Sequence, residues 1–302
     1  MKTVEKLRYR LRRMIFMAKK QGLEGKRVLV TGGASGIGLS LAEEFARRGC
    51  LPVLVDINQE ALAEAERRLL RVAPEVYALK VDVSDREEVV ELARRLEGAG
   101  SLPDILVNSA GVTLVAHTAC TTWEDWRRIL GVNLWGTVNV IYAFLPYIME
   151  KGGGHIVNIG SIDGLIPIPG QSAYCASKFA VTGLSEVLRY DLRPCGIGVT
   201  LVCPGYVDTP MARSHPVRDL PLRFPGWEKV ERFLSLFSSP PERIARETVR
   251  AVERGRFLVI PGLPSRAFYL LRRLFPGSAG RLGMLVGRLY WWARRPLPSS
   301  VR

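Results

Sequence analysis

Residues 26–49, KRVLVTGGASGIGLSLAEEFARRG, decide the fold. An apolar run suited to a β-strand comes first, a glycine-rich turn follows, and the last part repeats its apolar residues with the period of a helix. Glycines let the backbone approach a ligand closely, and free N–H groups in the first helical turn attract an anion. The stretch predicts a strand, a loop and a helix that hold a pyrophosphate group; the alternative is a tight structural turn.

A second apolar run, residues 51–55, ends at Asp56, which lies 18 residues after Gly38. A carboxylate at this place can accept hydrogen bonds from an adenosine ribose and would repel a 2′-phosphate. No arginine follows Asp56 directly, and Ser35 stands where a basic residue could have neutralised a phosphate. We therefore expect NAD rather than NADP. The alternative is that Asp56 only caps the helix expected over residues 59–71.

Strand and helix patterns alternate along most of the chain. After the first two strands we expect further strands at 76–81, 105–107, 155–159, 197–202 and 256–260. This alternation predicts an α/β fold: a single doubly wound Rossmann domain with a parallel sheet and helices on both faces. Ligands bind beyond the carboxyl ends of such strands, where the sequence places Asp82, Asn108, Gly111 and Ser161.

The stretch SIDGLIPIPGQSAYCASK, residues 161–178, carries the chemistry. Tyr174 and Lys178 are four residues apart, so they share one face of a helix. A phenol titrates near pH 10, and a neighbouring cation favours the phenolate, which brings proton transfer within reach of neutral pH. The Tyr174–Lys178 pair alone is weak evidence of catalysis, but it becomes stronger evidence because other motifs of the chain accompany it.

Taken together, these motifs resemble those of the short-chain dehydrogenase/reductase family over about residues 25–261. Ser161 lies thirteen residues before Tyr174 and Asn133 lies forty-one before it, as the family pattern requires. Ser109 is a small departure, because the family usually has a second asparagine there. The matching pieces are Thr31-Gly-Gly-Ala-Ser-Gly-Ile-Gly38, Asp82-Val83, Asn108-Ser-Ala-Gly111, Asn133, Ser161, Tyr174 with Lys178, and Pro204-Gly205.

The resemblance implies a role for each matching residue. Tyr174 would be the general acid or base, and Lys178 would lower its pKa and hold the nicotinamide ribose. Ser161 would stabilise the carbonyl or alkoxide, and Asn133, in a helix expected over 123–150, would anchor a water of a proton relay. The implied cofactor contacts are Gly32, Ser35, Gly36, Ile37, Gly38, Asp56, Asp82, Val83, Asn108, Ala110, Gly111, Tyr174, Lys178, Pro204, Gly205, Val207 and Thr209.

Metal and further catalytic roles are not expected. The three histidines share no metal spacing, and the five scattered cysteines suggest reduced thiols in a cytoplasmic protein. Asp163 lies close to Ser161, but a turn residue in Ser-Ile-Asp-Gly is the plainer interpretation, and we make no catalytic claim for it.

The net charge of +14 comes from the two ends of the chain. Residues 1–20 carry +7 and residues 262–302 carry +8, which leaves −1 between them. We therefore expect three parts: a basic amphipathic segment at 1–24, the catalytic domain at 25–261 and a basic apolar tail at 262–302. Both ends suit a peripheral position on an anionic membrane. For the N-terminal segment, a cleaved targeting sequence and a subunit-docking arm are the alternatives. The positive charge is the only feature of the sequence that would suit nucleic-acid binding, and no recognition motif accompanies it.

The expected function is oxidoreduction of a lipophilic alcohol or ketone by hydride transfer with NAD. A retinoid, a steroid, a 3-keto sphingoid base or a long-chain acyl derivative would suit an apolar lid at about 206–239, although this loop could instead form a dimer contact. The alternative is a catalytically silent protein that senses the dinucleotide or acts as a scaffold. The resemblance also implies a homodimer or homotetramer.

Overall fold

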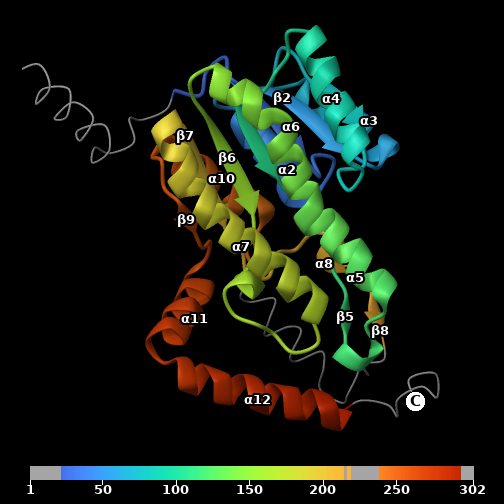
Figure 1. Cartoon of the computed structure of the whole chain (residues 1–302), viewed down its shortest axis with the longest axis vertical. Helices are drawn as coiled ribbons and strands as arrows, with labels where there is room; N and C mark the ends of the chain where they lie inside the picture. The colour runs from blue at the N-terminus through green and yellow to red at the C-terminus, as the bar shows by residue number, and fades with distance from the viewer. Residues whose placement is uncertain (1–21, 214–215, 219–237, 294–302) are drawn as a thin grey trace, which may run out of the picture.

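The computed structural model describes residues 22–213, 216–218 and 238–293. Seven parallel strands form one sheet in the order β3-β2-β1-β4-β6-β7-β9 (Figure 1). The predicted doubly wound sheet is therefore confirmed. The strands are β1 Arg27–Thr31, β2 Leu51–Asp56, β3 Tyr77–Lys80, β4 Ile105–Asn108, β6 Gly154–Ile159, β7 Ile197–Val202 and β9 Leu258–Val259.

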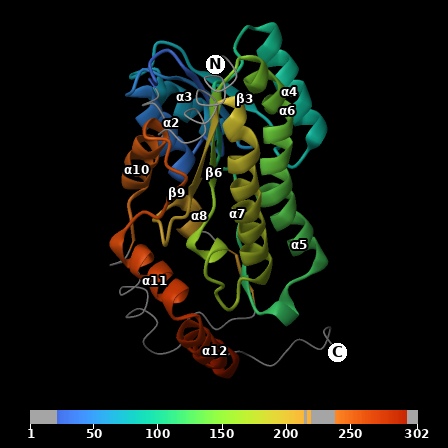
Figure 2. The same cartoon turned by 60° about the vertical axis from the view of Figure 1, so that its left-hand side comes forward.

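Helices cover both faces of the sheet, and Figure 2 shows the two layers on opposite sides of β6. One layer consists of α2 Gly36–Ala46, α3 Gln59–Leu69 and α10 Pro241–Glu253. The other consists of α4 Arg86–Gly98, α6 Gly136–Glu150 and α7 Ser172–Leu192.

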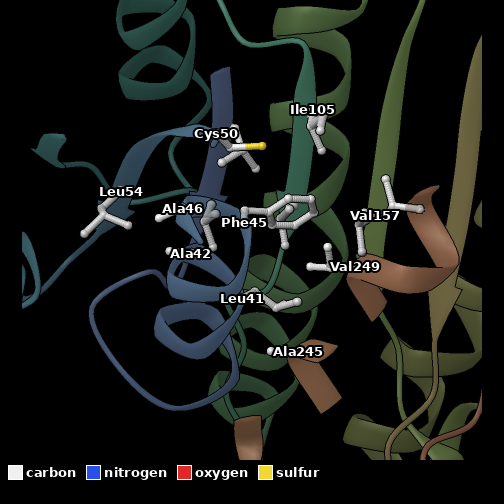
Figure 3. Close-up of a cluster of buried hydrophobic side chains, with 14 of the residues drawn as sticks. Leu41, Ala42, Phe45, Ala46, Cys50, Leu54, Ile105, Val157, Ala245 and Val249 are labelled. Atoms are coloured by element: carbon white, nitrogen blue, oxygen red, sulfur yellow. The ribbon is translucent and has the colours of Figure 1, made fainter. Parts of the chain in front are cut away.

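The strands are apolar along their length because both of their faces are buried. In β1, Val28 and Val30 pack under α2 and α10, whereas Leu29 belongs to the cluster under α4 and α6. Figure 3 shows Phe45 of α2 among Ile105 and Val249 in the first of these clusters. This packing holds the glycine-rich turn, which immediately precedes α2, against the sheet.

The helix expected over residues 123–150 is continuous but irregular. It consists of α5 Trp123–Leu130, a π-helical turn Gly131–Trp135 and α6. By length and composition it is the one candidate membrane span in the described part of the chain, with 39% of its apolar window buried. Length and apolar composition are weak evidence for a membrane span, because the core helix of a globular domain can have the same length and composition.

The basic C-terminal segment is helical as far as it is described. It forms α11 Leu263–Leu274 and α12 Pro276–Ala293, which lie beyond the carboxyl ends of the strands (Figure 1). Most of the expected lid, and the basic N-terminal segment up to residue 21, lie outside the described residues. The described part of the lid includes α8 Pro210–Arg213 and β8 Val217–Arg218, which pairs with β5 Val115–Ala116.

Replacing Phe45 by alanine should destabilise the fold by about 3–5 kcal/mol, because it opens a cavity between α2, α10 and the sheet. Chemical denaturation of the full chain measures this change. Leu70→Ala is the control, since Leu70 is 51% exposed and its loss should cost no more than about 0.5 kcal/mol. Equal effects of the two substitutions would contradict the packing described above.

Candidate active site

The glycine-rich turn lies against two other loops at the carboxyl edge of the sheet. Gly32 and Gly36 have φ values of +63° and +54°, which side chains other than glycine rarely adopt. A Cβ at Gly32 would lie 2.9 Å from the Cα of Ala110, and one at Gly36 would lie 3.3 Å from Cγ2 of Thr209. The backbone thus forms a narrow cradle that ends at the first turn of α2, which suits a pyrophosphate.

The first turn of α2 is free of side-chain capping. Ser35 occupies the N-cap position, yet its hydroxyl makes no capping hydrogen bond, and Ile37 and Gly38 follow inside the first turn. The N–H groups of this turn are therefore available to a bound anion.

Asp56 ends β2 and braces the glycine-rich turn. Its Oδ2 accepts a 3.2 Å hydrogen bond from the N–H of Ala34, and its Oδ1 accepts one of 3.1 Å from Asn58. The alternative role as a helix cap is wrong, because Asn58 caps α3 by accepting from the N–H of Ala61. Asp56 is thus a carboxylate held at the edge of the cradle, where an adenosine ribose would lie.

Asp82 and Val83 follow β3 at the same edge. The Oδ1 of Asp82 accepts hydrogen bonds from the N–H and hydroxyl of Ser84, at 2.8 and 2.7 Å. The carbonyl oxygen of Val83 accepts one of 3.0 Å from Asn139 of α6. The two residues are held in a fixed turn near the adenine end of the expected cofactor position.

The Asn108–Gly111 loop follows β4 and faces the glycine-rich turn. The hydroxyl oxygen of Thr31 accepts from the N–H groups of Ser109 and Ala110, both at 3.1 Å, and so joins the two loops. The side chain of Asn108 instead points into the protein, where its amide donates a 2.8 Å bond to Asn158. Its buried Oδ1 has no hydrogen-bond partner among the described residues.

Ser161, Tyr174 and Lys178 come together where β6 ends and α7 begins. The buried Nζ of Lys178 donates a 2.9 Å hydrogen bond to the carbonyl oxygen of Ile159, two residues before Ser161. The same Nζ lies 5.7 Å from the ring centre of Tyr174, one helical turn earlier. The Ser161 side chain lies close enough to the phenol to influence the pKa of Tyr174, so the three groups form one cluster.

The ionisation of this cluster is governed mainly by burial. Burial raises the pKa of Tyr174, the negative charge of Asp163 raises it further, and the Ser161 hydroxyl acts in the opposite direction. Burial also lowers the pKa of Lys178 to about 8. Burial thus outweighs the contributions that favour the phenolate, and the effect of Lys178 itself on the pKa of Tyr174 stays a prediction.

Asn133 lies in the π-helical turn and reaches the cluster through its amide. Its Oδ1 accepts from the N–H of Val112 at 2.8 Å, and its Nδ2 donates to the carbonyl of Val112 and to the hydroxyl of Ser177, both at 3.0 Å. A Cβ at Gly111 would lie 3.3 Å from this Oδ1 and 3.7 Å from the Nζ of Lys178. Asn133 is thus held by the backbone of Val112 and by Ser177, and it lies on the same side of Gly111 as Lys178.

The Pro204–Thr209 loop follows β7 and closes the edge. The carbonyl oxygen of Pro204 accepts a 2.8 Å bond from the N–H of Ile162, next to Ser161. Val207 is buried, and Thr209 is 9% exposed where it contacts Gly36. The loop also contacts α11, since a Cβ at Gly205 would collide with the hydroxyl of Ser265.

Two further polar residues, which carry no predicted catalytic role, belong to this cluster. Ser177 donates a 2.7 Å bond to the carbonyl oxygen of Tyr174 and accepts from Asn133, so it joins the π-helical turn to α7. Asp163 is buried beside Ser161 and influences both Tyr174 and Lys178. The spacing of Ser177 from Tyr174, three residues along one helix, was the available signal. The sequence placed Asp163 in a turn close to Ser161 but gave no sign of its burial.

Comparison with known proteins decides the family. The model of the short chain dehydrogenase family matches residues 26–218. The chain belongs to the short-chain dehydrogenase/reductase family. An oxidoreductase of Mycobacterium tuberculosis, named SadH, is 35% identical over 274 residues, which cover 90% of this chain and 99% of SadH.

Two further proteins represent this short-chain dehydrogenase/reductase family in other organisms. The 3-oxoacyl-[acyl-carrier-protein] reductase FabG of Thermotoga maritima is 32% identical over 77% of this chain and 98% of its own length. A short-chain dehydrogenase/reductase of Burkholderia phymatum, solved in complex with NAD, superimposes with a TM-score of 0.76 at 28% identity. That match covers 92% of this chain and 99% of the solved one. The family binds nicotinamide dinucleotides, and the cradle described above fits such a cofactor.

Proposed function

We propose that this protein is an NAD(H)-dependent oxidoreductase that interconverts an alcohol and a ketone or aldehyde. The cluster of Ser161, Tyr174 and Lys178, joined by the contacts at the end of β6, carries this proposal. NAD(H) would supply or accept the hydride. Tyr174 would donate or accept the proton on the substrate oxygen, and Ser161 would hydrogen-bond to that oxygen.

Lys178 and Asn133 support these steps in the proposal. Lys178 would hold the ribose hydroxyls of the nicotinamide half, and Asn133 would position a water between Lys178 and solvent. A Cβ at Gly111 would contact both the amide oxygen of Asn133 and the ammonium of Lys178, so the two side chains are neighbours, which supports a shared path for protons. The remaining contacts proposed for the cofactor are those of the glycine-rich turn, Asp56, Asp82-Val83, the Asn108–Gly111 loop and the Pro204–Thr209 loop.

A lipophilic substrate is supported by apolar side chains around the site. Ile168, Tyr206 and Met211 are between 37% and 43% exposed, and the methyl group of Met211 lies near Gly111. Gly287 of α12 approaches Pro169 in the loop before α7, so the C-terminal helices border the same region. These features favour a retinoid, a steroid, a 3-keto sphingoid base or a long-chain acyl derivative and a role in lipid metabolism.

Assembly of identical subunits is supported by an apolar stripe on the outer surface of α6 and α7. Trp135, Tyr142 and Met149 are seven residues apart, so they share one face of the continuous helix, and each is at least 46% exposed. Val187 and Tyr190 are also exposed on α7, which belongs to the same helical layer as α6 (Figure 2). Two such stripes can cover each other about a two-fold axis, which supports a homodimer or homotetramer.

We propose that the chain has three parts, residues 1–24, 25–261 and 262–302. A membrane contact is supported by α11, which belongs to the third part. Ser265 and Arg266 hold this helix, since Ser265 contacts Gly205 and Arg266 bonds to the carbonyl of Ile260 and to Glu247. Residues 262–302 contain eight arginines and no acidic residue, which complements an anionic membrane. The large apolar side chains that are exposed in the described part of this segment are Leu263, Phe268, Leu270, Leu271, Leu274, Phe275, Met284 and Leu285.

Tyr174→Phe should lower kcat by at least about 100-fold, because it removes the proposed proton donor, and should leave the Kd for NAD nearly unchanged. Tyr147→Phe is the control, since it removes only a hydrogen bond to Glu97 on the surface. Steady-state kinetics on a panel of hydrophobic alcohols and ketones gives the comparison. If the wild type binds NAD but converts no member of the panel, the result would favour the alternative function, a catalytically silent protein that senses the dinucleotide or acts as a scaffold.

Asp56→Asn should reduce the preference for NAD over NADP by at least about tenfold, since repulsion between like charges costs more than about 1.4 kcal/mol. Asparagine keeps an oxygen that can accept from the N–H of Ala34, so the loop stays braced. The ratio of kcat/KM values for the two cofactors is the measurement. An unchanged ratio would show that Asp56 only holds the loop.

The mass of the protein in solution should be two or four times that of the 33.6 kDa chain, and Trp135→Asp with Tyr142→Asp should reduce it. Light scattering measures both proteins. Val72→Asp, an exposed apolar position after α3 on the other side of the sheet, is the control and should leave the mass unchanged. A monomeric wild type would refute the proposed interface.

Full-length protein should sediment with vesicles that contain phosphatidylserine and much less with phosphatidylcholine alone, and salt should weaken the binding. Phe268→Asp with Leu271→Asp should reduce the sedimented fraction, whereas Val72→Asp should not. Binding of DNA without binding of anionic vesicles would contradict the membrane proposal.

A further inference from the structure

Arg218 belongs to β8, and its side chain reaches the first turn of α5. The guanidinium donates two hydrogen bonds to the carboxylate of Asp125, one from Nη1 to Oδ2 and one of 3.2 Å from Nη2 to Oδ1. Its Nη1 also donates a 3.2 Å bond to the carbonyl oxygen of Cys120, which ends the short helical turn before α5. The guanidinium thus binds both oxygens of one carboxylate, a geometry that makes an ion pair strong and directional.

The Asp125 end of this ion pair is buried in the frame of the protein. Asp125 is 6% exposed, and its Oδ2 also accepts hydrogen bonds from the N–H and the hydroxyl of Thr122, at 2.9 and 3.1 Å. The Thr122 hydroxyl in turn accepts the N–H of Asp125 at 3.2 Å, which completes a capping box at the start of α5. Arg218 therefore ties β8 to a carboxylate that α5 itself holds in place.

The backbone pairing of β8 is short. Its two residues pair in parallel with β5, Val217 with Val115 and Arg218 with Ala116 (Figure 1). The N–H of Val115 donates a 3.0 Å hydrogen bond to the carbonyl oxygen of Pro216, just before β8. So short a ladder is marginal on its own, and the ion pair of Arg218 adds side-chain binding energy at the same place.

The other edge of β5 borders the start of α7. The N–H of Ala116 donates a 2.8 Å hydrogen bond to the carbonyl oxygen of Gly170, and Ala116 forms a parallel bridge with Gln171. Ala116 also packs with Ala173 in one buried cluster, directly before Tyr174. The chain at Gln171, β5 and β8 therefore lie side by side, and this small sheet adjoins the part of α7 that carries the phenol.

The small sheet spans the distance between the cofactor loops and the phenol. β5 starts at Val115, four residues after Gly111, and its last residue pairs with Gln171. A substrate whose oxygen meets Tyr174 beside the nicotinamide therefore lies next to this sheet. We propose that Arg218 is a positioning residue of the substrate site: its ion pair with Asp125 holds β8 on β5 and so fixes the wall beside the phenol. This inference rests on the proposed function, in which the phenol acts on the substrate oxygen.

Arg218→Met in the full-length protein removes the guanidinium and keeps most of the apolar stem. Exchange of the Val115 N–H with deuterated solvent should become at least about tenfold faster, because hydrogen bonds to a charged group are worth that factor or more. The N–H of Ala116, which bonds to Gly170 instead, should change much less. Mass spectrometry with fragmentation to single residues measures both amides, and it needs neither substrate nor cofactor.

Arg127→Met is the matched control for this exchange experiment. Arg127 pairs with Glu124 on the outside of α5, where the two side chains are 78% and 77% exposed, so its loss should leave the exchange of Val115 unchanged. Asp125→Asn should add little to the exchange rate once Arg218 is replaced, because the two residues act as a pair. Unchanged exchange in Arg218→Met, equal effects of Arg218→Met and Arg127→Met, or additive effects of Arg218→Met and Asp125→Asn would overturn the proposal.

Steady-state kinetics separates a positioning role from a purely structural one. Arg218→Met should raise the KM for a lipophilic ketone by about tenfold or more, leave the Kd for NAD unchanged and lower kcat much less than Tyr174→Phe does. Faster exchange at Val115 with an unchanged KM would refute the role of Arg218 in the substrate site. Failure of the proposed enzyme would instead appear as absent turnover by the wild type, with the exchange rates still as predicted.

Discussion

The hydrogen bond from the buried ammonium of Lys178 to the carbonyl oxygen of Ile159 fixes α7 to the end of β6. Ser161 follows Ile159 by two residues, and Tyr174 precedes Lys178 by one helical turn. This one contact therefore determines how the Ser161 hydroxyl is placed relative to the Tyr174 phenol. It also satisfies part of an ammonium that would be costly to bury alone, and the carboxylate of Asp163 offsets more of that cost.

The positions of these groups follow from the fold. Parallel strands end at one edge of the sheet, so the loops after β1, β4, β6 and β7 meet there although they are far apart in the chain. Contacts between the loops then set the details: Gly32 against Ala110, Gly36 against Thr209, and Ile162 bonded to Pro204. The cradle and the proposed catalytic cluster are thus built from one set of strand ends.

The sequence was sufficient for the fold and for the grouping of Ser161, Tyr174 and Lys178, because strand periodicity and residue spacing are local signals. The direction of the pKa shift of Tyr174 could not be predicted, since it depends on burial by segments distant in sequence. The burial of Asp163 could not be predicted for a related reason: the sequence placed it in a turn close to Ser161, and only packing of that turn on α7 buries it. Asn108 likewise gave no sign that it bonds to Asn158 inside the protein.

The central claim is that Tyr174 and its neighbours act on a carbonyl group beside a nicotinamide. Transfer of deuterium tests it most directly: the protein is incubated with NADH deuterated at C4 of the nicotinamide and with lipophilic ketones, and the products are analysed by mass spectrometry. The account predicts deuterium on the alcohol carbon of a product formed by the wild type and its loss with Tyr174→Phe. Binding of the labelled cofactor with no deuterated alcohol from any ketone, or equal labelling by both proteins, would contradict it.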